Sequence, residues 1–190
     1  MARGTNDYGR VEGGLRHVAE LPSYVLANTG VLTMVTGLSL ISLLNPAASG
    51  QLAKVRRITI SVAVQENDVV GGVDLKLHRI TAHGTGATIT PRPFDTADAA
   101  SVCTGRQNMT VEPGYGVQLG TWSATVMKDN DVGQKFAGTT AFEFRIFDYV
   151  SGGPGKPLTL REGQGLTLEV DTNSVQAETC AVIEFTEEPA

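Results

Sequence analysis

Few residues of this sequence have the types and spacing that catalysis or ligand binding requires. The clearest loop motif is Gly153-Pro154-Gly155-Lys156, which is similar to the end of a phosphate-binding loop. Such a loop needs a Ser or Thr directly after the lysine to reach magnesium, and Pro157 stands there instead. We therefore interpret the segment as a hairpin loop.

A second candidate is the acidic turn at Asp129 and Asp131, which is similar to the beginning of a calcium-binding loop. The sharp turn of such a loop needs a glycine at the position that Gln134 occupies, and no Glu is placed to close the site. A solvated turn is the better interpretation. The sequence also lacks the GxSxG, HExxH and GxGxxG patterns that mark common enzyme sites.

The three histidines, His17, His78 and His83, could bind a metal if they converged with a carboxylate. We expect His78 on the polar side of a strand and His83 in a turn, and we interpret both as surface residues. An enzyme of cupin type, which needs clustered His and Glu ligands, is therefore an alternative that three scattered histidines do not favour. We expect no cofactor and no enzymatic activity.

Trp122 and Tyr115 could form a platform on which a sugar ring stacks. Together with the loop from Ser151 to Lys156, they make a carbohydrate-binding module or adhesin an alternative from another functional class. Trp122 is the only tryptophan, so a packing role in the core or at an interface is the simpler interpretation.

The two cysteines, Cys103 and Cys180, are too few for a disulfide framework, and no Cys/His cluster predicts a zinc site. We interpret both as small buried apolar residues. The N-terminal sequence lacks the apolar stretch of a secretory signal, so we expect the protein to be assembled in a cytoplasm.

Five segments alternate apolar and polar residues with the period of two that a half-buried β-strand requires. In the clearest one, Ile58, Ile60 and Val62 fall on one side of the strand, while Arg57 and Thr59 fall on the other. The five segments comprise residues 57–64, 73–78, 142–146, 166–171 and 183–186. Weaker strand candidates are residues 31–36, 38–44, 87–90, 109–111 and 117–127.

Turn-forming residues such as Asn45-Pro46, Gly71-Gly72 and Glu112-Pro113-Gly114 separate these segments. We therefore predict an all-β fold, an antiparallel jelly-roll-like β-sandwich of about eight to ten strands. The length of 190 residues favours a jelly roll over an immunoglobulin-like sandwich, which has about 100 residues. Helical composition is limited to residues 11–21 and 96–102, each sufficient for about one or two turns.

Residues 21–53 carry no formal charge, and their hydrophobicity raises the question of a membrane span. Polar residues interrupt the stretch, and the alternation of Leu38 and Leu40 shifts at Ile41. Alternation with β-branched residues is typical of strands rather than of a spanning helix. We expect no contact with a membrane.

We divide the chain into an N-terminal arm, residues 1–22, and a single β-sandwich (jelly-roll) domain, residues 23–190. The arm is polar and glycine-rich, so by itself it buries too little surface to stay ordered.

Charge is unevenly distributed along the chain. Residues up to Arg92 carry a net charge of +3 and the remainder −8, within a total of −5. This asymmetry suits a protein whose ends meet different partners, but we prefer an acidic C-terminal strand that faces solvent. The negative total disfavours direct binding of nucleic acid.

Three segments resemble virion structural proteins of tailed bacteriophages that are built on a jelly-roll sandwich. They are LSLISLLNPAASGQLAKVRRITISV at residues 38–62, ATITPRPFDTADAAS at residues 87–101 and PLTLREGQGLTLEV at residues 157–170. The resemblance implies a capsid-decorating or otherwise particle-attached protein, commonly a trimer. It transfers no catalytic residues.

We accordingly expect a non-enzymatic virion protein, a capsid decoration or cement protein that docks on the shell as an oligomer. Its partners would be other copies of itself and a major capsid protein, and its location would be the virion, assembled in the host cytoplasm. A capsid shell or tail protein is an alternative within this class. The residues that we expect at its interfaces are Arg3, Tyr8, Arg10, Arg16, His17, Tyr24, Leu26 and Val31.

Overall fold

The fold is all-β across the described part of the chain. The computed structural model describes residues 21–30, 32–64, 70–127, 141–149, 156–173 and 177–190, and these residues contain thirteen strands and no helix. The strands are β1 (Ser23–Ala27), β2 (Leu32–Thr33), β3 (Ser39–Asn45), β4 (Gln51–Val64), β5 (Val70–Ile80), β6 (Thr85–Ile89), β7 (Arg92–Pro93), β8 (Thr104–Val111), β9 (Gln118–Met127), β10 (Ala141–Asp148), β11 (Leu158–Leu160), β12 (Gln164–Asn173) and β13 (Ala177–Pro189).

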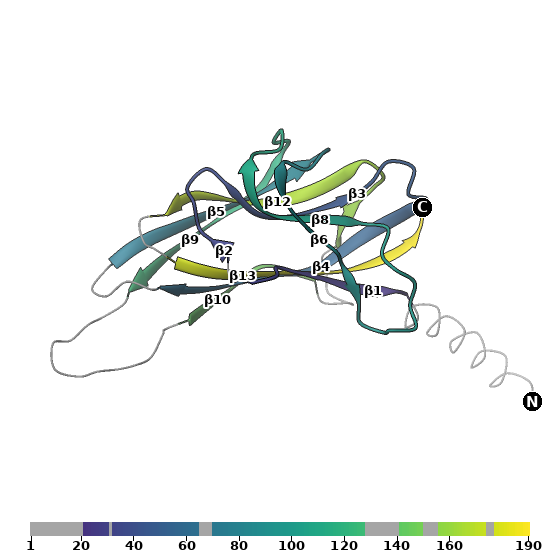
Figure 1. The fold of residues 1–190 in the computed structure, drawn as a ribbon, viewed down its shortest axis with the longest axis horizontal. Coiled ribbons are helices and arrows are strands. Elements are labelled where there is room, and N and C mark those ends of the chain that lie inside the picture. Colours follow the sequence, from purple (N-terminus) through teal and green to yellow (C-terminus); the bar gives the residue numbers. More distant parts are fainter. Residues whose placement is uncertain (1–20, 31, 65–69, 128–140, 150–155, 174–176) are drawn as a thin grey trace, which may run out of the picture.

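These strands form two antiparallel sheets that pack face to face as two layers (Figure 1). The seven-stranded sheet has the order β10-β4-β13-β1-β7, with β11 also pairing with β4 and β2 with β13. The six-stranded sheet has the order β6-β8-β3-β12-β5-β9.

The connectivity is that of a jelly roll, because the strand pairs are nested along the chain. The outermost pair is β1 with β13, followed inward by β3 with β12, β4 with β10, and β5 with β9, and successive pairs alternate between the two sheets. Strands β6 to β8 are inserted between β5 and β9 and extend the edges beyond β1 and β3. The predicted antiparallel jelly-roll sandwich is therefore confirmed.

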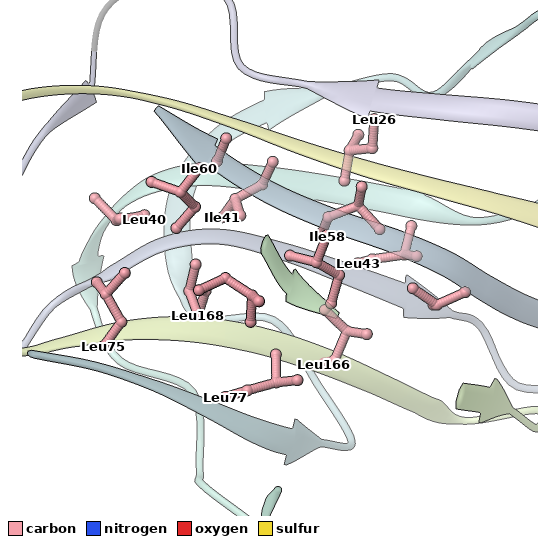
Figure 2. Packing of buried hydrophobic residues seen from close by; sticks show 14 of the residues in the cluster. Leu26, Leu40, Ile41, Leu43, Ile58, Ile60, Leu75, Leu77, Leu166 and Leu168 are labelled. Carbon is pink, nitrogen blue, oxygen red and sulfur yellow. The ribbon is translucent and has the colours of Figure 1, made fainter. Parts of the chain in front are cut away.

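The core lies between the sheets and consists almost entirely of aliphatic side chains. Those labelled in Figure 2 converge from both layers; Ile58 and Ile60 come from β4, and Leu166 and Leu168 from β12. All four are fully buried. The predicted alternation thus fixes which side of each strand faces the core.

The shift of pattern at Ile41 corresponds to an irregularity in the pairing of β3. Leu168 lies opposite Ile41, whereas Glu169 lies opposite Ser39, so Leu40 is an extra residue in β3. Leu40 and Ile41 both pack in the core. A bulge lets two consecutive side chains share one face, which simple alternation does not allow.

Two expectations of the sequence analysis are wrong in detail. The number of strands is thirteen rather than eight to ten, because short edge strands such as β2, β7 and β11 carry too few residues to show a period. Residues 96–102 form turns and bends instead of a helix, because their polar groups bind other parts of the chain, as described below. The helical candidate at residues 11–21 lies almost wholly outside the described residues.

The described part of the uncharged stretch, residues 21–53, forms strands rather than a membrane-spanning helix. Its described residues make up β1, β2, β3 and the beginning of β4. Within the described ranges, no helix is long and apolar enough to cross a membrane.

Candidate functional site

The most elaborate arrangement of polar groups lies on the outer face of the six-stranded sheet. The connection from β8 to β9, residues Glu112–Val117, is here called the strap. In the sheet, β3, β12 and β5 lie between β8 and β9, and strap residues contact side chains on both β3 and β5. The strap therefore crosses this outer face and covers part of it.

Glu112 anchors the first end of the strap. One carboxylate oxygen accepts a hydrogen bond from the backbone N–H of Ser39 at 2.6 Å, and the other accepts the Ser39 hydroxyl at 2.5 Å. The Tyr115 hydroxyl also donates to Glu112. Ser39 is only 2% exposed, so these are hydrogen bonds to a charged acceptor in a largely buried position, which are stronger than ordinary ones.

Tyr115 holds the middle of the strap against β5. Its ring stacks on the His78 ring with 4.5 Å between ring centroids, and the Nε2 of His78 lies 2.8 Å from a carboxylate oxygen of Glu169 on β12. Burial, and then the hydrogen bond to Glu112, raise the pKa of Tyr115 well above its ordinary value, so the phenol stays protonated.

His83 fixes the neighbouring turn between β5 and β6. Its two ring nitrogens lie 2.7 Å from the Ser42 hydroxyl and 2.9 Å from the Thr104 hydroxyl. Burial, reinforced by the positive charge of Arg106, lowers the pKa of His83 to about 4. The imidazole is therefore neutral at pH 7, with one nitrogen donating and the other accepting.

A hollow of about 570 Å³ opens beside the strap, a volume within the range of small-molecule sites. Its lining includes Arg79, Tyr115 and Gln164. The Arg79 guanidinium donates to the carbonyl of Thr159 at 2.9 Å, and burial lowers its pKa. The hollow thus offers hydrogen-bond donors and an aromatic edge, and no nucleophile paired with a base lines it.

Glu112 is only partly buried, but a second carboxylate that binds a connection, Glu187 on β13, is buried at the rim of the core. It is 5% exposed and accepts hydrogen bonds from the Ser101 hydroxyl at 2.5 Å and from the backbone N–H groups of Val102 and Cys103 at 3.3 and 3.2 Å. Burial, followed by the charge of Glu187, raises the pKa of Cys103. Glu187 therefore binds the connection before β8, and burial together with its charge keeps the Cys103 thiol protonated.

The two described residues of the expected interface face inward. Tyr24 is 2% exposed, stacks on Phe185 with 5.5 Å between ring centroids and donates to the carbonyl of Ala99. Leu26 is fully buried against Gly105. Neither side chain offers surface to another chain, because the alternation of β1 directs both into the core. Arg3, Tyr8, Arg10, Arg16, His17 and Val31 lie outside the described residues.

The structure separates the residues on which the alternative functions depend. Trp122 lies opposite Leu75 and packs against the core, whereas Tyr115 stacks on His78 on the opposite face of the same sheet. The two aromatic rings therefore cannot form one sugar platform. The rest of that proposed site, residues 151–155, and the acidic turn at Asp129 and Asp131 lie outside the described ranges.

The histidine and cysteine expectations have mixed outcomes. His78 and His83 both lie on the outer face of the six-stranded sheet, away from the interior where a cupin-type metal site would form, and His78 is buried rather than at the surface. The described residues include no group of three or more His, Cys, Asp or Glu placed to hold a metal ion. Cys103 is buried as expected, but Cys180 is exposed, so only one of the pair is a core residue.

The sequence analysis missed both of these carboxylates. Glu112 was part of a predicted turn, and nothing nearby in sequence reveals its bond to Ser39, which is 73 residues away. For Glu187 a signal existed, because it continues the series of Ile183 and Phe185 on the core side of β13.

Similarity to known proteins assigns no function to this chain. No family model matches the sequence, and no curated protein matches it significantly.

Proposed function

We propose that this protein is a non-enzymatic structural component of a tailed-bacteriophage virion, a decoration protein that docks on the capsid shell as an oligomer. The jelly-roll topology is the observation that carries the proposal. Viral capsid proteins, lectins and cupins are among the proteins that use this fold, so topology alone leaves several functions open. The details of the site favour one of these classes.

The distribution of polar groups favours the capsid class over the other two. The interior is filled with aliphatic side chains, and the two described histidines face outward rather than into it. Trp122 and Tyr115 lie on opposite faces of a sheet. Glu112 and Glu187 both accept hydrogen bonds that bind connections to the sandwich, which supports a role for these carboxylates in maintaining its shape.

The docking surface would consist of the connection between β7 and β8 and of the N-terminal arm. Phe94 and Val102 belong to the connection that Glu187 holds, and they expose 60% and 37% of their surface. Exposed apolar side chains on a fixed connection are suited to contact another protein. We propose that they contribute to the interface with other copies, as a trimer, and with a major capsid protein, together with arm residues between Arg3 and His17.

The test is reassembly on particles. Purified full-length chain is mixed with capsid shells from the source virion that have been stripped of it, and bound copies are counted after sedimentation. Full-length protein should saturate at a fixed number of copies per shell. Removal of residues 1–20 should abolish binding while the urea-unfolding transition of the sandwich remains.

Two controls make the result decisive. Phe94→Ser tests the exposed connection, and Thr88→Ser, at an exposed position on β6, is the matched substitution that should bind normally. Failure of the full-length chain to bind any shell contradicts the decoration role. A copy number equal to that of the shell subunits, or confined to the tail, would instead identify one of the other virion components.

A further inference from the structure

The two sheets end in four edge strands, and three of these are protected against pairing with another chain. Strand β7 has only two residues and includes Pro93. Strand β6 has five residues and an irregular register. Strand β10 carries Glu143, Arg145 and Asp148. Short length, proline, irregular pairing and charge are the usual means by which proteins block a sheet edge.

The fourth edge, β9, has only one of these protections, a register shift near its beginning at Leu119. It has ten residues, QLGTWSATVM, without a charged residue or a proline. It pairs with β5 on one side, and no strand of the described ranges pairs with its other side. In an antiparallel ladder, about half of the backbone N–H and C=O groups of such a strand point away from its partner.

Apolar surface accumulates at the same edge. Val117 and Leu119 expose 71% and 39% of their surface, and Leu119 is the extra residue of a register shift between β9 and β5. Trp122 is only partly buried, at the end of the core. A long, uncharged edge with exposed aliphatic residues is expected to associate with another strand.

We infer that β9 pairs antiparallel with β9 of a second copy of this chain, around a two-fold axis at Trp122. Such a contact is isologous, so each strand must be complementary to itself. The absence of charge on β9 means that self-pairing brings no like charges together. In this register, Thr121 lies opposite Ser123 of the second copy in both halves of the contact, which gives two pairs of hydroxyl residues.

Pairing would join the two six-stranded sheets into one and place the two core-facing Trp122 side chains beside each other across the axis. A partner of opposite charge has nothing to recognise on this edge, which favours a second copy over a charged peptide. The inference goes beyond the proposed function, because it does not require a capsid. A two-fold contact can also join two trimers.

The first test is the assembly state of the full-length protein in sedimentation-velocity experiments over a range of concentrations, combined with hydrogen exchange. A two-fold assembly whose β9 amides exchange more slowly as it forms would support the inference. Protein that does not self-associate, or an assembly that leaves exchange in β9 unchanged, would overturn it.

Two matched double variants test the register. The substituted residues, Thr121 and Ser123, are exposed and lie opposite Lys76 and Asp74, respectively, in the same chain. Thr121→Glu with Ser123→Glu places like charges opposite each other across the axis, and should raise the dissociation constant roughly tenfold or more. Thr121→Glu with Ser123→Lys places opposite charges there, and should retain the assembly. Equal behaviour of the two variants would contradict the pairing, whereas either result leaves the capsid proposal to its own test.

Discussion

The outer faces of the two sheets are held together in different ways. On the seven-stranded sheet, partly exposed ion pairs join the neighbouring strands β4 and β13: Lys54 contacts Glu188 at 2.5 Å, and Arg57 contacts Glu184 at 3.5 Å. On the six-stranded sheet, the strap and its neighbouring turn enclose buried polar residues such as Ser39 and Ser42.

The difference shows where polar groups contribute to stability. Exposed ion pairs typically contribute about 0–1 kcal/mol, because solvent screens them and the long side chains lose freedom. A buried donor that loses its acceptor costs about 1–3 kcal/mol, because water cannot replace the partner. We therefore expect the six-stranded sheet to depend on its outer polar layer far more than the seven-stranded sheet does.

The largest effect is expected for Glu112→Ala. The substitution removes the acceptor of the Ser39 amide and the charged acceptor of the Ser39 and Tyr115 hydroxyls, which retain only their contact with each other at 3.3 Å. The free energy of unfolding, measured by urea denaturation, should fall by about 2–3 kcal/mol. Hydrogen exchange should increase in the strap and at the beginning of β3. A change no larger than that of a surface substitution would contradict the asymmetry between the sheets.

A smaller effect is expected from the titration of His83. Its pKa is about 4 in the folded protein and 6.5 ordinarily, so below pH 6.5 the unfolded chain takes up the proton first. The contribution of the neutral His83 ring to the free energy of unfolding is complete above pH 6.5 and is lost as the pH falls towards 4. The free energy of unfolding should fall by about 1–2 kcal/mol over this range, after allowance for the partial exposure of His83.

The measurement is a urea-unfolding series between pH 7 and 4 on the wild type and His83→Asn. The variant should lack this part of the pH dependence, while the background from carboxylates remains in both proteins. Parallel curves would show that His83 does not contribute.

The smallest effect is expected for Glu188→Ala on the seven-stranded sheet. This substitution removes a carboxylate, as Glu112→Ala does, but one that pairs with the partly exposed ammonium group of Lys54. The free energy of unfolding should change by less than about 0.5 kcal/mol, and 1 M salt should reduce the difference further. A loss comparable with that of Glu112→Ala would remove the distinction between the two faces.

The sequence predicted the layers better than the connections. The alternation of Ile58, Ile60 and Val62 identifies a core-facing strand side because that information is local. The strap contact between Glu112 and Ser39 joins residues 73 positions apart, and no local pattern encodes it.

The uneven distribution of charge along the chain is also explained by contacts between residues that are distant in sequence. The basic N-terminal part and the acidic C-terminal part are distant in sequence but adjacent in the fold, since β4 pairs with β13 along its length. Glu184 and Glu188 thereby meet Arg57 and Lys54. Their partners lie within the chain, and only the pairing of distant strands reveals them.

The nested order of strands constrains how the polypeptide acquires this shape during synthesis. Strand β13, which follows the other described strands in the sequence, occupies the middle of its sheet between β1 and β4. Until it leaves the ribosome, both neighbours present unpaired backbone groups to other nascent chains. Contacts of such long sequence separation form slowly. We therefore expect truncation that removes β13 to yield aggregates, and chaperones to have their greatest effect before β13 has been synthesised.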